Sequence, residues 1–183
     1  MTAPHVLGAM PTDWDMTTVD EQLVRAPLPI IFALSSDVIR WPIHLAHYRY
    51  VRFLEKRSDG GGLVEMSANR PFGFANWPTH WTSLMSVAAP DSAVIPSIRF
   101  RHVRGVTTGM EVEWSFVETP HGTEVRITHV WNGPQWPVVG SVAARGVIGP
   151  VFVHGIASRT LAGLARAAER MATDASQIEV SSG

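Results

Sequence analysis

Two segments in the second half of the chain alternate in the period of two that is typical of strands with one buried face. The first runs from Val106 to Thr119 and the second from Gly122 to Trp131. The residues expected to share the buried face are Met110, Val112, Trp114 and Phe116 in the first segment, and Val125, Ile127, His129 and Trp131 in the second. Glutamate, serine, threonine and arginine fill most of the intervening positions. We therefore predict two antiparallel strands with one wet and one buried face.

Four similar runs precede these two segments, with Gly, Pro, Asp and Asn clustered between them. The six predicted strands cover residues 48–56, 63–69, 79–88, 94–103, 106–119 and 122–131. Turn residues such as Ser58-Asp59-Gly60-Gly61-Gly62 and Pro120-His121-Gly122 join them. This spacing is typical of an antiparallel meander.

The period changes near the C-terminus. From about Pro150, apolar residues recur at helical spacing, opposite three arginines. The apolar positions are Val153, Ile156, Ala157, Leu161, Leu164, Ala168 and Met171. We predict one long amphipathic helix, with a separate turn or two of helix over Val138–Arg145, because Gly146–Pro150 should kink or start the long helix.

The N-terminal part predicts different elements. Thr18–Arg25 is strand-like, and the two prolines that follow it end the strand and open a short helix to Leu34. A second short helix is expected over Val38–Trp41, where Pro42 interrupts or ends it.

Together these elements predict an α+β chain with a helix-grip fold: a curved seven-stranded antiparallel sheet around the long C-terminal helix, with two short helices after strand 1. Bending the sheet around the helix covers the apolar faces of both. We divide the chain into an N-terminal arm (1–16), the helix-grip domain (17–173) and a flexible tail (174–183). The sheet and helix enclose more volume than the helix fills, so we also expect an apolar ligand cavity.

Composition narrows the classes of partner. The 183 residues are 45% hydrophobic, carry a formal net charge of -1 and contain no long Lys/Arg block, which argues against nucleic acid. Without cysteine there is no disulfide, thiolate metal site or cysteine nucleophile. No signal-peptide pattern and no apolar run of the ~18 residues needed to span a membrane is present, so we expect a cytoplasmic protein without a membrane partner.

Several short motifs occur in a fixed order between Val19 and Met171. They are His47-Tyr48 with Val51-Arg52-Phe53-Leu54-Glu55, Asn69-Arg70-Pro71, Trp81-Thr82-Ser83, Gly109-Met110 with Trp114, Gly122-Thr123-Glu124-Val125 ending at His129, and Ser158-Arg159-Thr160. In this order the span resembles the START/Bet v 1-like (SRPBCC) superfamily, and within it the polyketide aromatase/cyclase-like branch.

The resemblance implies an enzyme that binds a flexible polyketone chain in its cavity, bends it, and promotes aldol closure and loss of water. It implies no cofactor, and it allows delivery of the substrate by an acyl carrier protein. Tyr48, Trp81 and Ser83 match lining positions of aromatase-type members, and His129 stands where such members carry His or Gln. In two places the chain departs from the family pattern: Met85 replaces the cavity arginine, and the asparagine that some members have on the helix falls near Gly155–Ala157.

From these residues we select candidates. His129 and Tyr48 are the proposed catalytic groups, because imidazole and phenol can move or hold protons in an apolar pocket. The proposed substrate-binding residues are Trp81, Ser83, Met85, Trp114, Phe116, His102, Tyr50 and Arg70. Tyr50 is expected on the same strand face as Tyr48.

Each candidate also has a purely structural interpretation. His129 is as readily a core histidine with one hydrogen bond, and His102, near a strand end, is more readily a solvated side chain. The tryptophans and tyrosines can be ordinary packing. Arg70 can meet a carboxylate or a phosphopantetheine phosphate, but a solvated turn arginine is the default. Arg99 and Arg101 are expected to face outward.

Two further patterns carry little weight. His44 and His47 form an H-x-x-H pair, but no third or fourth metal ligand is near them in sequence, so we expect no metal site. Gly60-Gly61-Gly62 lacks the lysine and the helix of a phosphate-binding loop, and a hairpin turn explains it better.

The sequence leaves three functions open. The first is a polyketide cyclase/aromatase-like lyase or dehydratase, and the second is a non-catalytic carrier or sensor of a hydrophobic metabolite. The third is a structural subunit whose arm, Met1 to Asp15, docks on a partner. Both a monomer and a homodimer remain open.

Overall fold

The computed structural model describes residues 7–72, 75–90, 95–133 and 154–181, without the side chains of residues 70–72, 75–77, 154 and 179–181. The strands are β1 (Met16–Val24), β2 (Tyr48–Lys56), β3 (Gly62–Phe72), β4 (Ala75–Ala88), β5 (Ser97–Gly105), β6 (Glu111–Thr119) and β7 (Gly122–Trp131). The helices are α1 (Leu28–Ser36), the short 3-10 helix η1 (Val38–Arg40), α2 (Trp41–His44) and α4 (His154–Ser181).

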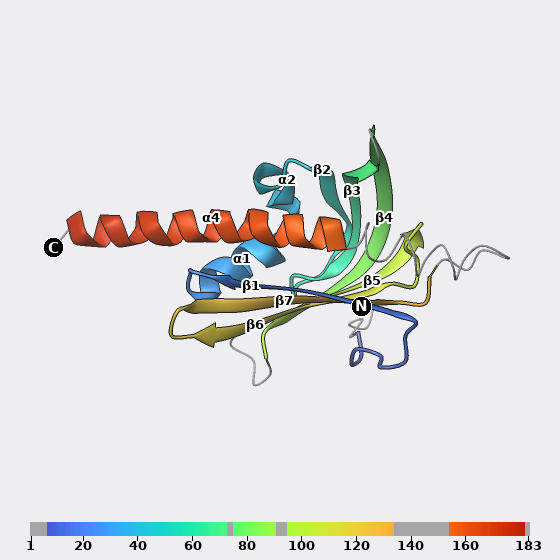
Figure 1. Ribbon diagram of the computed structural model, residues 1–183, viewed down its shortest axis with the longest axis horizontal. Helices are drawn as coiled ribbons and strands as arrows, with labels where there is room; N and C mark the ends of the chain where they lie inside the picture. Colours follow the sequence, from blue (N-terminus) through green and yellow to red (C-terminus); the bar gives the residue numbers. More distant parts are fainter. Residues whose placement is uncertain (1–6, 73–74, 91–94, 134–153, 182–183) are drawn as a thin grey trace.

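The strands form one antiparallel sheet in the order β1-β7-β6-β5-β4-β3-β2. β2 to β7 are therefore a meander, and β1 completes the sheet beside β7, with Thr18 opposite His129. The sheet curves, so that β2, β3 and β4 turn away from β1, β6 and β7, while α4 runs along the concave side with α1 beside it (Figure 1). The predicted helix-grip fold is confirmed.

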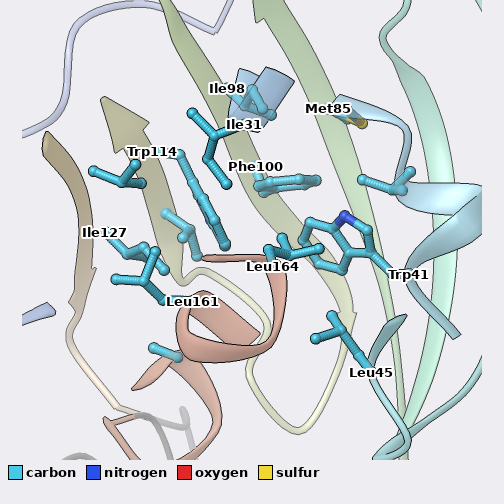
Figure 2. Close-up of a cluster of buried hydrophobic side chains, with 14 of the residues drawn as sticks. Ile31, Trp41, Leu45, Met85, Ile98, Phe100, Trp114, Ile127, Leu161 and Leu164 are labelled. Carbon is cyan, nitrogen blue, oxygen red and sulfur yellow. The ribbon is translucent and has the colours of Figure 1, made fainter. Parts of the chain in front are cut away.

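The core lies between the concave face of the sheet and α4. From α4, Leu161, Leu164, Ala165 and Ala168 are buried at the helical spacing seen in the sequence. Their partners across the core include Phe100, Trp114 and Ile127 of the sheet, with Trp41 of α2 reaching into the same cluster (Figure 2). Burial of these two apolar faces is the main stabilising term of the fold.

The C-terminal helix is longer than the sequence predicts. The expected flexible tail, 174–183, is helical as far as Ser181, and the helix extends past the sheet (Figure 1). Side chains from Thr173 to Ile178 are exposed. No glycine or proline interrupts this stretch, so the backbone hydrogen bonds continue although the apolar stripe has ended.

Two predicted boundaries were wrong for reasons of local chemistry. β6 begins at Glu111 rather than Val106, because residues 106–109 form a turn that follows Gly105 and ends at Gly109, both with positive φ. Pro42 does not end the second short helix, because it lies in the first turn of α2. Backbone N–H groups in the first turn have no hydrogen-bond partner within the helix, so a proline is tolerated there. The predicted helix over Val138–Arg145 lies outside the described residues.

The described part of the N-terminal arm, residues 7–15, lies against the outer face of the sheet. The backbone carbonyl of Gly8 accepts a hydrogen bond from Arg99 Nη1 at 2.7 Å, and the Asp15 N–H donates to Asn132 Oδ1 at 2.9 Å. Arg99 does lie on the outer face of β5, as predicted, but it is buried there instead of solvated. Its guanidinium is 3.0 Å from the carboxylate of Glu111, which also pairs with the exposed Arg101.

Candidate functional site

A cavity of about 70 Å³ lies between the concave face of the sheet and the first turns of α4. That is room for several water molecules, since one water needs ~10–15 Å³ of such space. Its apolar lining consists of Trp41, Met66, Trp81, Phe100, Met110, Val112, Trp114, Ile127, Ile156 and Ala157. The polar lining residues are Tyr48, His102, His129 and Thr160, one each from β2, β5, β7 and α4. Polar residues from four separate elements therefore line one apolar space.

Tyr48 occupies its place through aromatic packing. Its ring makes an edge-on contact with Trp41, with centroids 5.2 Å apart, and a second contact with Trp81 at 6.1 Å. Because edge-to-face pairs have a preferred geometry, these contacts restrict the direction of the phenol. The predicted position of Tyr48 at the cavity agrees with the structure.

His102 lines the cavity from within β5 and is buried, not solvated. Its Nδ1 lies 2.6 Å from Oγ1 of Thr107, in the turn between β5 and β6. The imidazole lies nearly parallel to the indole of Trp81, with an interplanar angle of 22°. The hydrogen bond with Thr107 and the contact with Trp81 both orient this histidine.

His129 reaches the cavity from β7, where it is paired with Thr18 of β1 and Val112 of β6. The side chain is partly exposed, although its Nδ1 atom is buried. Imidazole titrates near neutral pH, which suits a group that exchanges protons with a ligand.

Thr160 is the polar residue that α4 contributes. Its Oγ1 lies 3.1 Å from Nε2 of His47, which precedes β2. The segment before β2 lies so close to α4 that a side chain at Gly163 would collide with Leu45. His47, the second histidine of the H-x-x-H pair, therefore connects α4 to the segment just before β2. Within the described part of the chain, no three His, Asp or Glu side chains gather as metal ligands.

Three proposed binding residues lie in the core and not at the cavity. Met85 and Phe116 are fully buried, and Phe116 packs edge-on against Phe32 with centroids 5.2 Å apart. Ser83 is also fully buried, on the same strand face as Trp81, and its hydroxyl has no hydrogen-bond partner among the described residues. Trp81 and Trp114, in contrast, line the cavity as proposed.

Tyr50 lies on the opposite strand face from Tyr48. The register of β2 against β3 shifts between these two residues, because a bulge there inserts one extra position. On the outer face, the Tyr50 hydroxyl donates to Glu65 Oε1 at 3.0 Å and lies 3.1 Å from His80 Nδ1. Burial and the neighbouring Glu65 carboxylate raise the pKa of Tyr50. The side chain of Arg70 lies outside the described residues.

Among the lining residues that the candidate site omitted are Thr160, Trp41 and Met66, and it also omitted Thr107, which contacts His102. Thr160 was within reach, because it follows Ile156 and Ala157 at helical spacing on the face turned toward the sheet. Thr107 was hidden, because the segment that holds it was assigned to a strand. Trp41 comes from a four-residue helix, for which periodicity carries no information.

Comparison with known proteins places this cavity in context. Residues 24–150 match the family described as polyketide cyclase / dehydrase and lipid transport. The chain belongs to this family. No curated protein sequence matches the chain.

Solved structures with a similar fold include an aromatase/cyclase and a START superfamily protein. ZhuI aromatase/cyclase from Streptomyces sp. R1128 is 18% identical, with a TM-score of 0.67 over 85% of this chain and 94% of that one. TTHA0849 from Thermus thermophilus is 16% identical, with a TM-score of 0.67 over 82% and 95%. A START superfamily protein from Mycobacterium smegmatis is 19% identical, with a TM-score of 0.58 over 86% and 97%. These likenesses establish a shared fold.

None of the described helices combines the length and the apolar character that a membrane span requires.

Proposed function

We propose that the protein is a cyclase of the aromatase type, which binds a hydrophobic polyketide-type substrate in the cavity and promotes aldol cyclisation and dehydration. The observation that carries this proposal is the convergence of Tyr48, His102, His129 and Thr160 on a space otherwise lined by apolar side chains. An apolar pocket with several convergent polar groups is suited to catalysis as well as binding.

The proposed reaction divides naturally between these groups. His129 removes a proton from a methylene between two carbonyls, and the enolate carbon forms a bond to a second carbonyl carbon of the same chain. The new alkoxide takes up a proton from a donor such as Tyr48. Loss of a second α-proton and of the β-hydroxyl then releases one water and leaves a double bond. Hydrogen-bond donors at the carbonyl oxygens stabilise the charge that develops there.

The aromatic residues give the proposal its substrate class. Trp41, Trp81 and Trp114 present flat surfaces around the cavity, with the Trp41 and Trp114 centroids 5.7 Å apart. Flat surfaces favour a planar product ring over a flexible aliphatic chain. The solved neighbour ZhuI is named an aromatase/cyclase, which is in keeping with this class.

A second function is favoured by one specific observation. Among the described lining residues there is no lysine or arginine. Met85, at the position where the resemblance implies an arginine, is fully buried in the core. Without a cation, the site is suited to holding a neutral hydrophobic metabolite. The alternative is therefore a carrier or sensor that uses the same cavity without chemistry.

The experiment that separates the two has a binding stage and a reaction stage. Thermal-shift measurements with aromatic polyketides, fatty acids, sterols and terpenoids should show stabilisation by the aromatic class, because a ligand that binds the folded state raises its melting temperature. Native mass spectrometry of the purified protein detects any ligand that copurifies with it.

The reaction stage uses an acyl-carrier-bound poly-β-ketone and follows the loss of water by mass spectrometry. The proposal predicts ring formation by the wild type and a loss of ~10²–10⁴-fold in rate for His129→Ala. Equal binding of polyketides by both proteins, with no ring formation by either, would establish the carrier instead. Repeating the assay with a soluble thioester analogue tests the proposed delivery by a carrier protein.

A further inference from the structure

We propose that Trp41 limits the size of the ligand that the cavity accepts, and that its indole excludes ligands with three or more fused rings. This inference rests on the proposed function only for the chemical class of the ligand, because a size limit applies equally to a cyclase and to a carrier. It is therefore tested by binding, without any reaction.

The cavity is small compared with the sites that hold drug-sized ligands. Its volume is about 70 Å³, whereas such sites commonly measure ~300–1,000 Å³. An engineered apolar cavity of ~150 Å³ accommodates benzene. A ligand of several fused rings therefore competes for space with at least one lining side chain.

The Trp41 indole occupies the space between other lining rings. Its centroid lies 5.2 Å from that of Tyr48, 5.7 Å from that of Trp114 and 6.2 Å from that of Phe100. All of these residues line the cavity. Figure 2 shows the indole pointing from α2 toward Phe100. Because the neighbouring rings also border the cavity, removal of the indole would join its volume to the existing space.

The orientation of the indole is fixed in the unliganded protein. Its Nε1 donates a hydrogen bond to the Leu34 carbonyl of α1 at 3.2 Å, and only 2% of Trp41 is exposed. The Trp41 carbonyl accepts a hydrogen bond from the Leu45 N–H at 2.8 Å, which holds the backbone of α2. The indole is therefore part of the lining before any ligand arrives.

Trp41 differs from the two lining tryptophans of the sheet. Trp81 and Trp114 lie on β4 and β6, which are paired with neighbouring strands on both sides. Trp41 instead begins α2, a helix of four residues that lies outside the sheet. Shortening this side chain leaves every strand pairing in place. The size of the ligand can therefore change at Trp41 without rebuilding the sheet.

The test compares the affinities of 2-naphthol, which has two fused rings, and 2-hydroxyanthracene, which has three, by titration of the ligand's own fluorescence. The wild type should bind 2-hydroxyanthracene at least about tenfold more weakly, although its third ring adds apolar surface. Trp41→Ala should reverse this order, because the third ring then fills the space of the indole. Trp41→Leu, which keeps part of the apolar bulk, should give an intermediate ratio of affinities.

Trp131→Phe is the matched control. Trp131 is also a fully buried tryptophan, but it lies outside the described lining of the cavity. Its variant should keep the wild-type ratio of affinities. A fall in the folded fraction lowers both affinities equally, so the ratio is insensitive to a general loss of stability. Trp41→Leu keeps the test decisive if Trp41→Ala fails to fold.

Three results would overturn the inference: an unchanged ratio in the Trp41 variants, an equal change in Trp131→Phe, or tighter binding of 2-hydroxyanthracene than of 2-naphthol by the wild type. Failure of the wild type and of the Trp41 variants to bind either ligand would also count against it. If the ratios behave as expected but the wild type forms no ring from a poly-β-ketone, the proposed function fails and the size limit remains.

Discussion

The inner and outer faces of the sheet each hold a histidine on neighbouring strands, His102 on β5 and His80 on β4. Exposed His80 belongs to a charged network in which Tyr50 lies between it and Glu65, and Glu65 accepts from Arg52 Nε at 2.9 Å. Buried His102 is bonded to the neutral Thr107 within an apolar lining. Charges in contact with water are screened, whereas a polar group that lines a cavity acts on a ligand at low dielectric. The same residue type is therefore structural on one face and suited to chemistry on the other.

The outer face also contains a buried ion pair, and the largest expected effect on stability is there. Glu111→Ala should lower the free energy of unfolding by about 3 kcal/mol, because it leaves Arg99 buried without its nearest carboxylate. The Arg99 and Glu111 side chains are only 7% and 4% exposed, and Glu113, at 3.7 Å, remains as a weaker partner. Urea unfolding measures the change.

A matched control is available on the same face. Glu21 and Arg126 form a pair whose side chains are 53% and 61% exposed. Glu21→Ala should change the free energy of unfolding by less than about 1 kcal/mol. Equal losses for the two variants would show that the arm does not bury the Arg99 pair in solution.

The next effect concerns the two histidines themselves. His102→Ala should slow ring formation by ~10²–10³-fold, the usual loss when one donor to a developing oxyanion is removed. His80→Ala should leave the rate within about twofold, because its contacts are on the outer face. Rates from the water-loss assay are compared with melting temperatures to separate catalysis from folding. A large loss of rate for His80→Ala, with none for His102→Ala, would show that the outer face and not the cavity carries the reaction.

A smaller effect is expected from filling the cavity. Ala157→Leu adds volume at a buried lining position on the first turns of α4. Affinity for 2-naphthol should fall about tenfold or more, equivalent to ~1.4 kcal/mol, because side chain and ligand compete for the same space. Calorimetric titration measures this loss. Ala172→Leu, farther along α4 and away from the lining, should bind as the wild type does, and equal losses would place the ligand elsewhere.

The smallest effect concerns the pH dependence of stability. The pKa of Tyr50 is raised above its ordinary value of 10.0, so above that pH the folded protein keeps a proton that the unfolded chain loses. Stability should therefore fall as pH rises above about 10, and it should fall less steeply in Tyr50→Phe. At neutral pH this variant should lose about 1 kcal/mol or less. Identical pH profiles would mean that the Tyr50–Glu65 bond is absent in solution.

Much of the fold could be predicted, because its signals are local. Alternation in β6 and β7 and the helical stripe of α4 both follow from which side chains avoid water. The errors occurred where local chemistry competes with the pattern. The turn at 106–110 continued an apparently strand-like run, and the helical signal at the end of α4 lacked the apolar residues that make a helix visible.

The candidate site was only partly predictable. Tyr48, Trp81, Trp114, His102 and His129 were proposed at the cavity and line it. Tyr50 was misplaced because a single bulge exchanges the two faces of a strand, and no residue in β2 signals it. Ser83, Met85 and Phe116 share the correct face with the lining residues, but curvature places them deeper in the core.

The sequence by itself determined the class of fold and the apolar character of its interior, since periodicity and composition decide which surfaces must be buried. Only the tertiary structure decided which polar groups meet. His102 and Thr107 are five residues apart, and His47 and Thr160 are 113 apart, yet both pairs form at the same cavity. Such contacts between distant side chains depend on sheet curvature, register and helix placement. These are set by packing over the whole domain and not by any one segment.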